Sequence, residues 1–368
     1  MLEGSVVVSR NAKDTAATIF DRLVRYAADR GVQIPLGERY IFLDEAEYDI
    51  LVRTKRLAHV KFGRNQAAAL IKSQNTVVLA IAGFEAEAVV STSQTREVEM
   101  TAGLAVAMLA DLEVNPSASP ASVLDVAGAG SAADGGYQGH DLDLVLGLYP
   151  DMQALEIDDL AAGWTDLDAN LLPTCARQGA HGNGWVNSEL AGELAMLGEQ
   201  RIAGIPYEFL TRAVLDLNPT SLFLSLYRCL EATYAYTKAS ELATTLGISK
   251  PWIEIAEALG NTLSWYPRHD QGLAAVLAMP TVGSDELEAL AVALGRDEGA
   301  DALSTRVAAG VRELRNSLVH YGPTTRQVAI LNDDWNALCI PLARVVGSVF
   351  AHAYAGDLPA VSSTLGDR

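Results

Sequence analysis

The pattern of apolar residues changes near Pro206, and this change constrains the fold more than any other feature of the sequence. Upstream, short apolar runs alternate with amphipathic segments. Downstream, apolar residues recur at the three- and four-residue spacing of helices. We expect helices over 222–246, 252–265, 284–294, 303–319 and 334–354, with Asp334 as a helix N-cap and glycine or proline at the breaks. This part is predicted to be a compact all-α domain of about five helices.

The first ~95 residues instead predict an α/β or α+β unit. A helix is expected over 14–30, and strands over 5–9, 40–43, 75–83 and 85–93. Residues 115–140 have the proline, serine and glycine content of a linker or long loop. The fold class is thus an α+β N-terminal region followed by an all-α C-terminal domain. We divide the chain into an α/β or α+β domain and possible sensor (1–115), an acidic middle region (116–204), the helical domain (205–356) and a tail (357–368).

The net charge of −19 is unevenly distributed. Residues 97–176 hold fourteen acids and no Lys or Arg, whereas residues 1–96 have a balance of +2. Nucleic-acid affinity depends on local basic patches, so this acidity weakens such a function without excluding it. The strongest basic segment supplies our candidate RNA-binding residues: Arg53, Lys55, Arg56, Lys61 and Arg64. The alternative is a solvated helix-to-strand face.

Localisation and cofactors are predicted mostly from what the sequence lacks. No apolar run approaches the ~20 residues of a membrane helix, and the N-terminal segment has no secretory pattern. Cys175, Cys229 and Cys339 stand far apart, without the spacing of a disulfide framework or zinc site. His140 with Asp141 and Asp143 could bind a cation, but a metal site needs three or more convergent ligands, and a solvated acidic loop is the favoured interpretation. We therefore expect a cytoplasmic protein with no membrane association, metal or cofactor.

Residues 123–130, VLDVAGAG, have a weak resemblance to the cofactor loop of S-adenosylmethionine-dependent methyltransferases. That loop needs a strand, a tight glycine turn and then a helix N-terminus. The segment that follows, SAADGGY, is a poor helix. A nucleotide- or S-adenosylmethionine-binding enzyme with its site in the N-terminal region remains an alternative.

The segment 311–323, VRELRNSLVHYGP, carries the most chemistry. On a helix, one narrow apolar stripe faces the core and consists of Leu303, Val307, Val311, Leu314 and Leu318. Arg312, Arg315, Asn316 and His320 fall on the remaining arc, where Asn316 and His320 are expected to stack four residues apart. Val319 lies among them, which suggests that this face meets another surface.

RNSLVH, residues 315–320, resembles the R-x4-6-H motif of the HEPN superfamily. An earlier segment, LFLSLYRCLEATYAYTK, has a pattern with Glu231 that is similar to HEPN first helices. The resemblance covers about residues 205–356 and implies metal-independent RNA cleavage, in which the ribose 2′-OH attacks the adjacent phosphate. In this family two chains combine their motifs. His320 would then be the acid or base, Arg315 the phosphate clamp and Asn316 an orienting group. Arg312 is not part of the motif and is only a candidate auxiliary cation.

Two functions follow from this resemblance. The first is an endoribonuclease of a defence or toxin type, acting on RNA as a homodimer through the Arg315/His320 face. Its N-terminal part would bind a trigger molecule or inhibitor protein. The second is a non-catalytic HEPN module for binding or dimerisation, because a His near a helix end is also what an ordinary C-cap produces.

Overall fold

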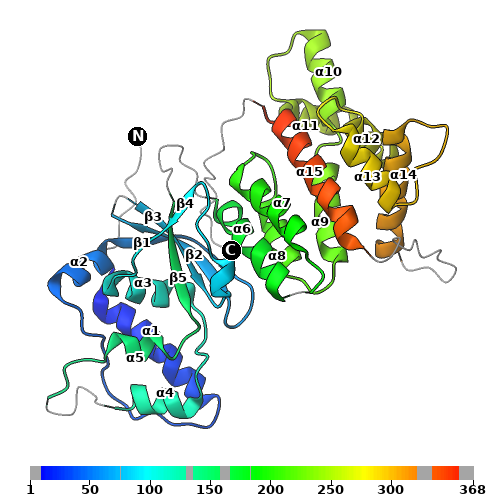
Figure 1. The fold of residues 1–368 in the computed structure, drawn as a ribbon. Coiled ribbons are helices and arrows are strands. Elements are labelled where there is room, and N and C mark those ends of the chain that lie inside the picture. The colour runs from blue at the N-terminus through cyan, green and yellow to red at the C-terminus, as the bar shows by residue number, and fades with distance from the viewer. Residues whose placement is uncertain are drawn as a thin grey trace. The chain divides into compact units, whose positions relative to one another are not determined.

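The computed structural model describes residues 10–74, 76–129, 136–157, 166–182, 184–320 and 334–355 (Figure 1). The chain forms two compact units, with the boundary between Leu171 and Leu172. Unit 1 holds an antiparallel sheet with helices and unit 2 is helical, which confirms the expected change from α+β to all-α structure. The strand expected over 5–9 and the tail at 357–368 lie outside the described residues.

The sheet of unit 1 has five antiparallel strands in the order β1-β2-β3-β5-β4. They span β1 (Thr54–Lys61), β2 (Ala67–Ser73), β3 (Thr76–Ala82), β4 (Thr95–Glu97) and β5 (Met152–Ile157). Strand β5 lies between β3 and β4, although its residues belong to the segment that we assigned to an acidic middle region. The first compact unit therefore extends well past the boundary that we placed at residue 115.

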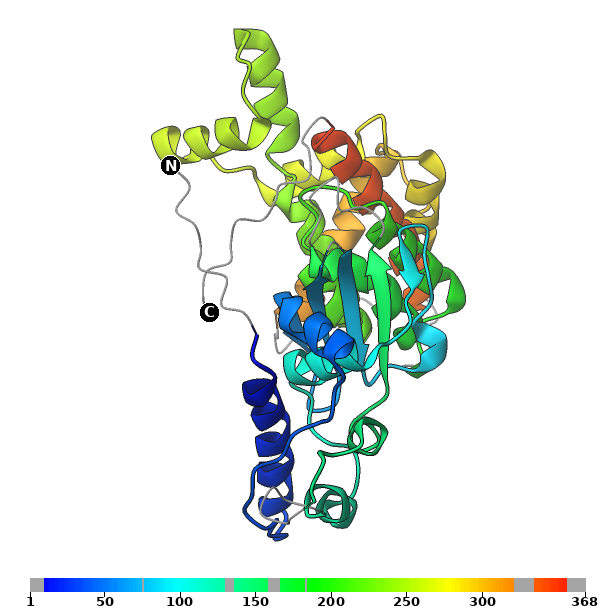
Figure 2. The ribbon, with the colours of Figure 1, turned by 90° about the vertical axis from the view of Figure 1, so that its left-hand side faces the viewer.

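The helices of unit 1 form layers over the sheet. They are α1 (Ala12–Ala28), α2 (Glu45–Arg53), α3 (Ala102–Leu112), α4 (Pro120–Ala127), α5 (Leu142–Leu146) and the 3-10 turn η1 (Ala86–Ala88). The apolar helix α3 contacts β1, β2 and β3, and α1 packs on α3 and α4 (Figures 1 and 2). Helix α3 thus separates α1 from the sheet, which explains why α3 is buried almost all round.

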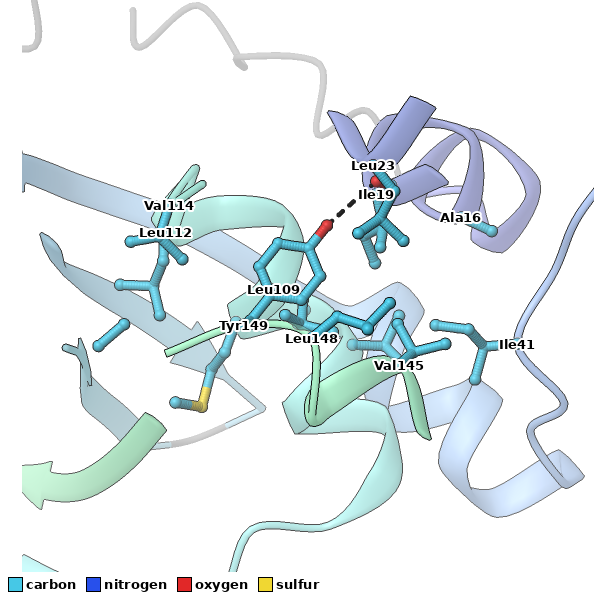
Figure 3. Close-up of a cluster of buried hydrophobic side chains, with 14 of the residues drawn as sticks. Ala16, Ile19, Leu23, Ile41, Leu109, Leu112, Val114, Val145, Leu148 and Tyr149 are labelled. Atoms are coloured by element: carbon cyan, nitrogen blue, oxygen red, sulfur yellow. Dashed lines mark hydrogen bonds between the residues drawn. The ribbon is translucent and has the colours of Figure 1, made fainter. Parts of the chain in front are cut away.

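The core of unit 1 joins these layers (Figure 3). Ile19 and Leu23 on α1 are fully buried, as are Leu109 and Leu112 on α3. Tyr149 inserts among them, and its hydroxyl donates to the Ile19 carbonyl oxygen at 3.2 Å. Burying each such large apolar side chain stabilises the fold by roughly 1.5–3 kcal/mol.

Three local predictions for unit 1 are wrong. Residues 85–93 contain the 3-10 turn η1 instead of a strand, because both edges of β3 are already paired, with β2 and β5. Residues 40–43 form only an isolated bridge between Ile41 and His140. The supposed linker contains α4, with Ser119 as its N-cap and Pro120 in its first turn, a favourable start for a helix.

Unit 2 consists of helices and begins inside α6. The helices are α6 (Leu167–Gly182), α7 (Ser188–Glu199), α8 (Tyr207–Val214), α9 (Thr220–Ala232), α10 (Tyr236–Leu246), α11 (Trp252–Leu263), α12 (His269–Leu277), α13 (Ser284–Ala293), α14 (Leu303–Val319) and α15 (Trp335–Ala353). The expected helix over 222–246 is divided into α9 and α10, and α6, α7, α8 and α12 were not predicted. Asp334 does cap α15.

Helix α15 is the central helix of unit 2. It packs against α7, α9 and α13. Among the described helices it alone is long and apolar enough to cross a membrane, but 67% of that apolar window is buried inside the structure. Its apolar character is therefore accounted for by its place in the core.

Candidate functional site

Helix α14 carries the RNSLVH segment and is held by the predicted apolar stripe. Val307 and Val311 are fully buried and Leu314 is 1% exposed, in a helix that contacts α9, α12 and α13. The helix ends at Val319. His320 then adopts an extended backbone (φ −106°, ψ 112°), and its N–H donates to the Asn316 carbonyl oxygen at 2.9 Å. The stripe places the segment at an exposed helix end.

The polar residues of the segment lie together at this end, on the last turns of α14 and its C-cap. Arg315 is half-buried, and its Nη1 donates to Asn316 Oδ1 at 3.2 Å. Asn316 and His320 are exposed, and Val319 is 48% exposed. His320 is the C-cap of α14, and the expected stacking of its side chain on Asn316 stays a prediction. Arg312 is half-buried and has no ion pair with any described residue.

A tyrosine pair that we did not single out from the sequence lies beside Arg315. The Arg315 Cζ is 5.7 Å from the centroid of the Tyr227 ring, within the range of a cation–π contact. Tyr227 and Tyr234 are both buried, and burial raises the pKa of each hydroxyl, whereas the Arg315 charge acts in the opposite direction. Both tyrosines belong to the segment that also contains Glu231. Only packing shows that it meets α14.

Three of the five candidate RNA-binding residues of unit 1 pair with carboxylates. Arg53 pairs with Asp49 at 2.9 Å, and Arg56 pairs with Glu113 at 2.8 Å. Lys61 lies 3.5 Å from the same Glu113 carboxylate. The remaining two candidates, Lys55 and Arg64, are exposed and have no ion pair with a described residue.

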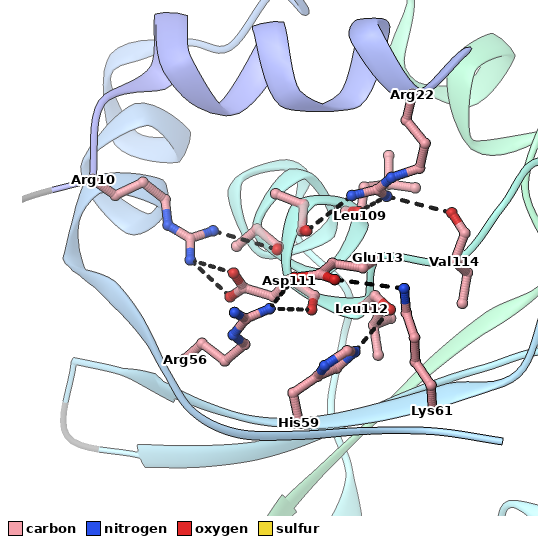
Figure 4. A network of polar contacts seen from close by, with 12 residues as sticks. Arg10, Arg22, Arg56, His59, Lys61, Leu109, Asp111, Leu112, Glu113 and Val114 are labelled. Atoms are coloured by element: carbon pink, nitrogen blue, oxygen red, sulfur yellow. Dashed lines mark hydrogen bonds and ion pairs between the residues drawn. The ribbon is translucent and has the colours of Figure 1, made fainter. Parts of the chain in front are cut away.

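One of these cations, Arg56, completes the C-terminal end of α3 together with His59 and Arg22 (Figure 4). A β-bulge between Arg56 and Ala58 puts Arg56 on the side of β1 that carries His59. Arg56 donates to the Asp111 carbonyl oxygen at 2.9 Å, and His59 Nε2 lies 3.0 Å from that of Leu112. From α1, Arg22 donates to the Leu109 carbonyl oxygen at 2.8 Å. These groups satisfy the unpaired carbonyls of a helix end and offset its negative dipole.

The remaining candidates from the sequence are the residues around His140 and the glycine-containing segment 123–130, and the contacts of both are structural. In the described parts of the chain, no three His, Cys, Asp or Glu side chains are grouped to hold a metal ion. The His140 ring packs 4.7 Å from that of Phe20, and burial lowers its pKa, while Asp141 caps α5. Residues 123–127 are helical, in α4, so the strand that a methyltransferase loop requires is not formed there.

Comparisons with known proteins identify no relative of this chain. The chain matches no protein-family profile, no curated protein and no solved structure.

Proposed function

We propose that this chain is a metal-independent endoribonuclease of the HEPN type, with Arg315 and His320 at its active site. The observation that supports the proposal most is the arrangement at the end of α14. The Arg315 guanidinium contacts Asn316 and lies over Tyr227, and the exposed His320 follows within one and a half helical turns. A positioned cation and an accessible imidazole are two of the groups that phosphate-ester cleavage by a neighbouring hydroxyl uses.

A complete site requires two copies of the chain. Cleavage needs an acceptor for the 2′-OH proton and a donor for the leaving 5′-oxygen, and one imidazole cannot serve both at once. Two motifs facing each other provide two His and two Arg. Val319, 48% exposed between the polar groups, would then be covered by the partner. The product would be a 2′,3′-cyclic phosphate and a 5′-hydroxyl.

The biological setting belongs to the same proposal. A cytoplasmic nuclease that acts on the cell's own RNA needs restraint, so we assign unit 1 the binding of a trigger molecule or inhibitor protein. Under this proposal the chain is a defence or toxin protein.

A non-catalytic HEPN module is the second candidate. The observation in its favour is that His320 occupies the C-cap position of α14, where an imidazole also complements the helix dipole. Such a module would dimerise through the same face without cleaving RNA. RNA cleavage therefore distinguishes the nuclease from the non-catalytic module.

Single substitutions at the end of α14 test the proposal. His320→Ala removes the proton-transfer group, and the loss should be about 10² to 10⁴ in cleavage rate. Arg315→Ala removes the phosphate clamp, with a loss that can be as large. Arg312→Ala is the matched control, because it removes a cation from the same helix but lies outside the motif. The assay is cleavage of labelled RNA in EDTA, with circular dichroism to confirm that each variant is folded and light scattering to confirm that it is dimeric.

The possible outcomes separate the candidates. Loss of cleavage in the first two variants and near-normal cleavage in Arg312→Ala supports the nuclease. A wild-type dimer that cleaves no RNA supports the non-catalytic module. Full cleavage activity in folded His320→Ala and Arg315→Ala would contradict the assignment of these residues to the active site.

A further inference from the structure

Unit 1 contains a cavity lined by cations that the proposed nuclease site does not use. Its volume is about 940 Å³, and the end of α1, the end of α3 and the β1–β2 turn form its walls. A second cavity of about 520 Å³ shares four lining residues with it, namely Tyr26, Arg30, Arg64 and Asn115. We propose that the two together bind a small phosphorylated ligand with the chemistry of a nucleotide. Volumes of ~300–1,000 Å³ are typical of small-molecule sites.

The charge of the larger cavity favours an anion. Two carboxylates line it, those of Asp29 and Glu113, against five cations: Arg22, Arg25, Arg30, Lys61 and Arg64. This is a local excess of three positive charges in a chain whose net charge is −19. A concave surface with cations on its walls concentrates the positive potential and attracts phosphate groups.

Two of the five cations are available to a ligand. Arg22 is committed to the end of α3, and Lys61 lies 3.5 Å from the Glu113 carboxylate. Arg25 and Arg64 are exposed, and neither side chain has an ion pair or hydrogen bond with any described residue. They come from α1 and from the β1–β2 turn, on different walls of the cavity. A guanidinium from each wall can bind phosphate oxygens in two-point contacts.

The smaller cavity, which also holds Arg30 and Arg64, adds groups that can hydrogen-bond an uncharged part of the ligand. The amide side chains of Asn65, Gln66 and Asn115 line it, and Gln66 Nε2 donates to the Gly83 carbonyl oxygen at 3.0 Å. Amide side chains suit the paired donors and acceptors at the edge of a base. The Arg30 guanidinium, 3.8 Å from the Tyr26 ring centroid, adds a flat surface where the two cavities meet. A ligand that places phosphates in the larger cavity and a base in the smaller one is a nucleotide.

Direct binding measurements on the full chain test this proposal. The probes are ATP, GTP, inorganic tripolyphosphate and a short single-stranded RNA, measured by calorimetry on the His320→Ala background so that RNA stays intact. ATP or GTP should bind, and tripolyphosphate should bind more weakly because it lacks a base. Arg25→Ala and Arg64→Ala should each raise the nucleotide Kd about tenfold. Lys55→Ala is the control: it removes an exposed cation of β1 that lines neither cavity, and it should leave the Kd unchanged.

Four results would overturn the proposal. They are no binding of either nucleotide, a Kd unchanged in the double variant Arg25→Ala/Arg64→Ala, equal affinity for tripolyphosphate, and binding of the RNA without binding of nucleotides. Equal affinity for tripolyphosphate would identify a general polyanion site, and the last result would identify an RNA groove if Arg25→Ala/Arg64→Ala also weakened the RNA binding. Because the readout is binding, and the Arg25 and Arg64 substitutions locate that binding to unit 1, the test of the cavity does not depend on whether α14 cleaves RNA.

Discussion

Replacing Arg22 with Met tests whether the Arg22 side chain stabilises the packing of α1 on α3. The Arg22 guanidinium donates to the carbonyl oxygens of Leu109 (2.8 Å), Ala110 (3.2 Å) and Val114 (3.4 Å). Methionine keeps an apolar stem against the helices but removes every donor. Hydrogen bonds to charged groups contribute about 1.5–3 kcal/mol each, and the open cavity beside Arg22 lets water replace part of that. Counting the two shorter contacts, we expect unit 1 to be destabilised by about 2–4 kcal/mol.

Arg25→Met is the matched control, because Arg25 lies on the same helix and its side chain donates to no described group. Its effect should stay within about 0.5 kcal/mol, as for other surface substitutions. The tryptophans all lie at or after residue 164, so fluorescence would report mainly on unit 2. Hydrogen exchange of peptides covering α3 is therefore the appropriate assay. Equal protection of α3 in the Arg22 and Arg25 variants would refute the role of Arg22 as a cap.

Three further predictions concern pH, metal and salt. Unit 1 should lose stability as the pH falls below about 6.5, because burial lowers the pKa of His140, so that the unfolded state takes up the proton first. His140→Gln should flatten this dependence in hydrogen-exchange measurements, and an identical slope in the variant would count against it. RNA cleavage should survive EDTA, and activity restored only by Mg²⁺ would exclude the proposed mechanism. Replacing Arg53, Lys55, Arg56 and Lys61 together should reduce the salt slope of RNA binding by about one unit for each phosphate that these side chains neutralise in the wild-type complex. An unchanged slope would mean that these cations bind no RNA phosphate.

Regular periodicity made part of the fold predictable from the sequence. Helix α14 was expected at the residues where it occurs, and α15 within a residue or so, because their apolar residues repeat at helical spacing and Asp334 caps the second. Strand β3 was expected for its run of β-branched residues. The segment 85–93 has a similar composition, but no edge of β3 was left for it to pair with. Composition indicates which segments can form strands, whereas pairing partners decide which of them do.

The order of groups at the end of α14 follows from the sequence alone. Arg315, Asn316 and His320 lie within one and a half turns of each other, and the rise of a helix keeps residues so close in sequence close in space. Tertiary structure decided the rest. It brought Tyr227 beside Arg315, and it put Arg25 and Arg64, 39 positions apart in the sequence, on different walls of one cavity. Such proximity depends on how helices and strands pack, and local periodicity does not indicate which distant segment will cover a given face.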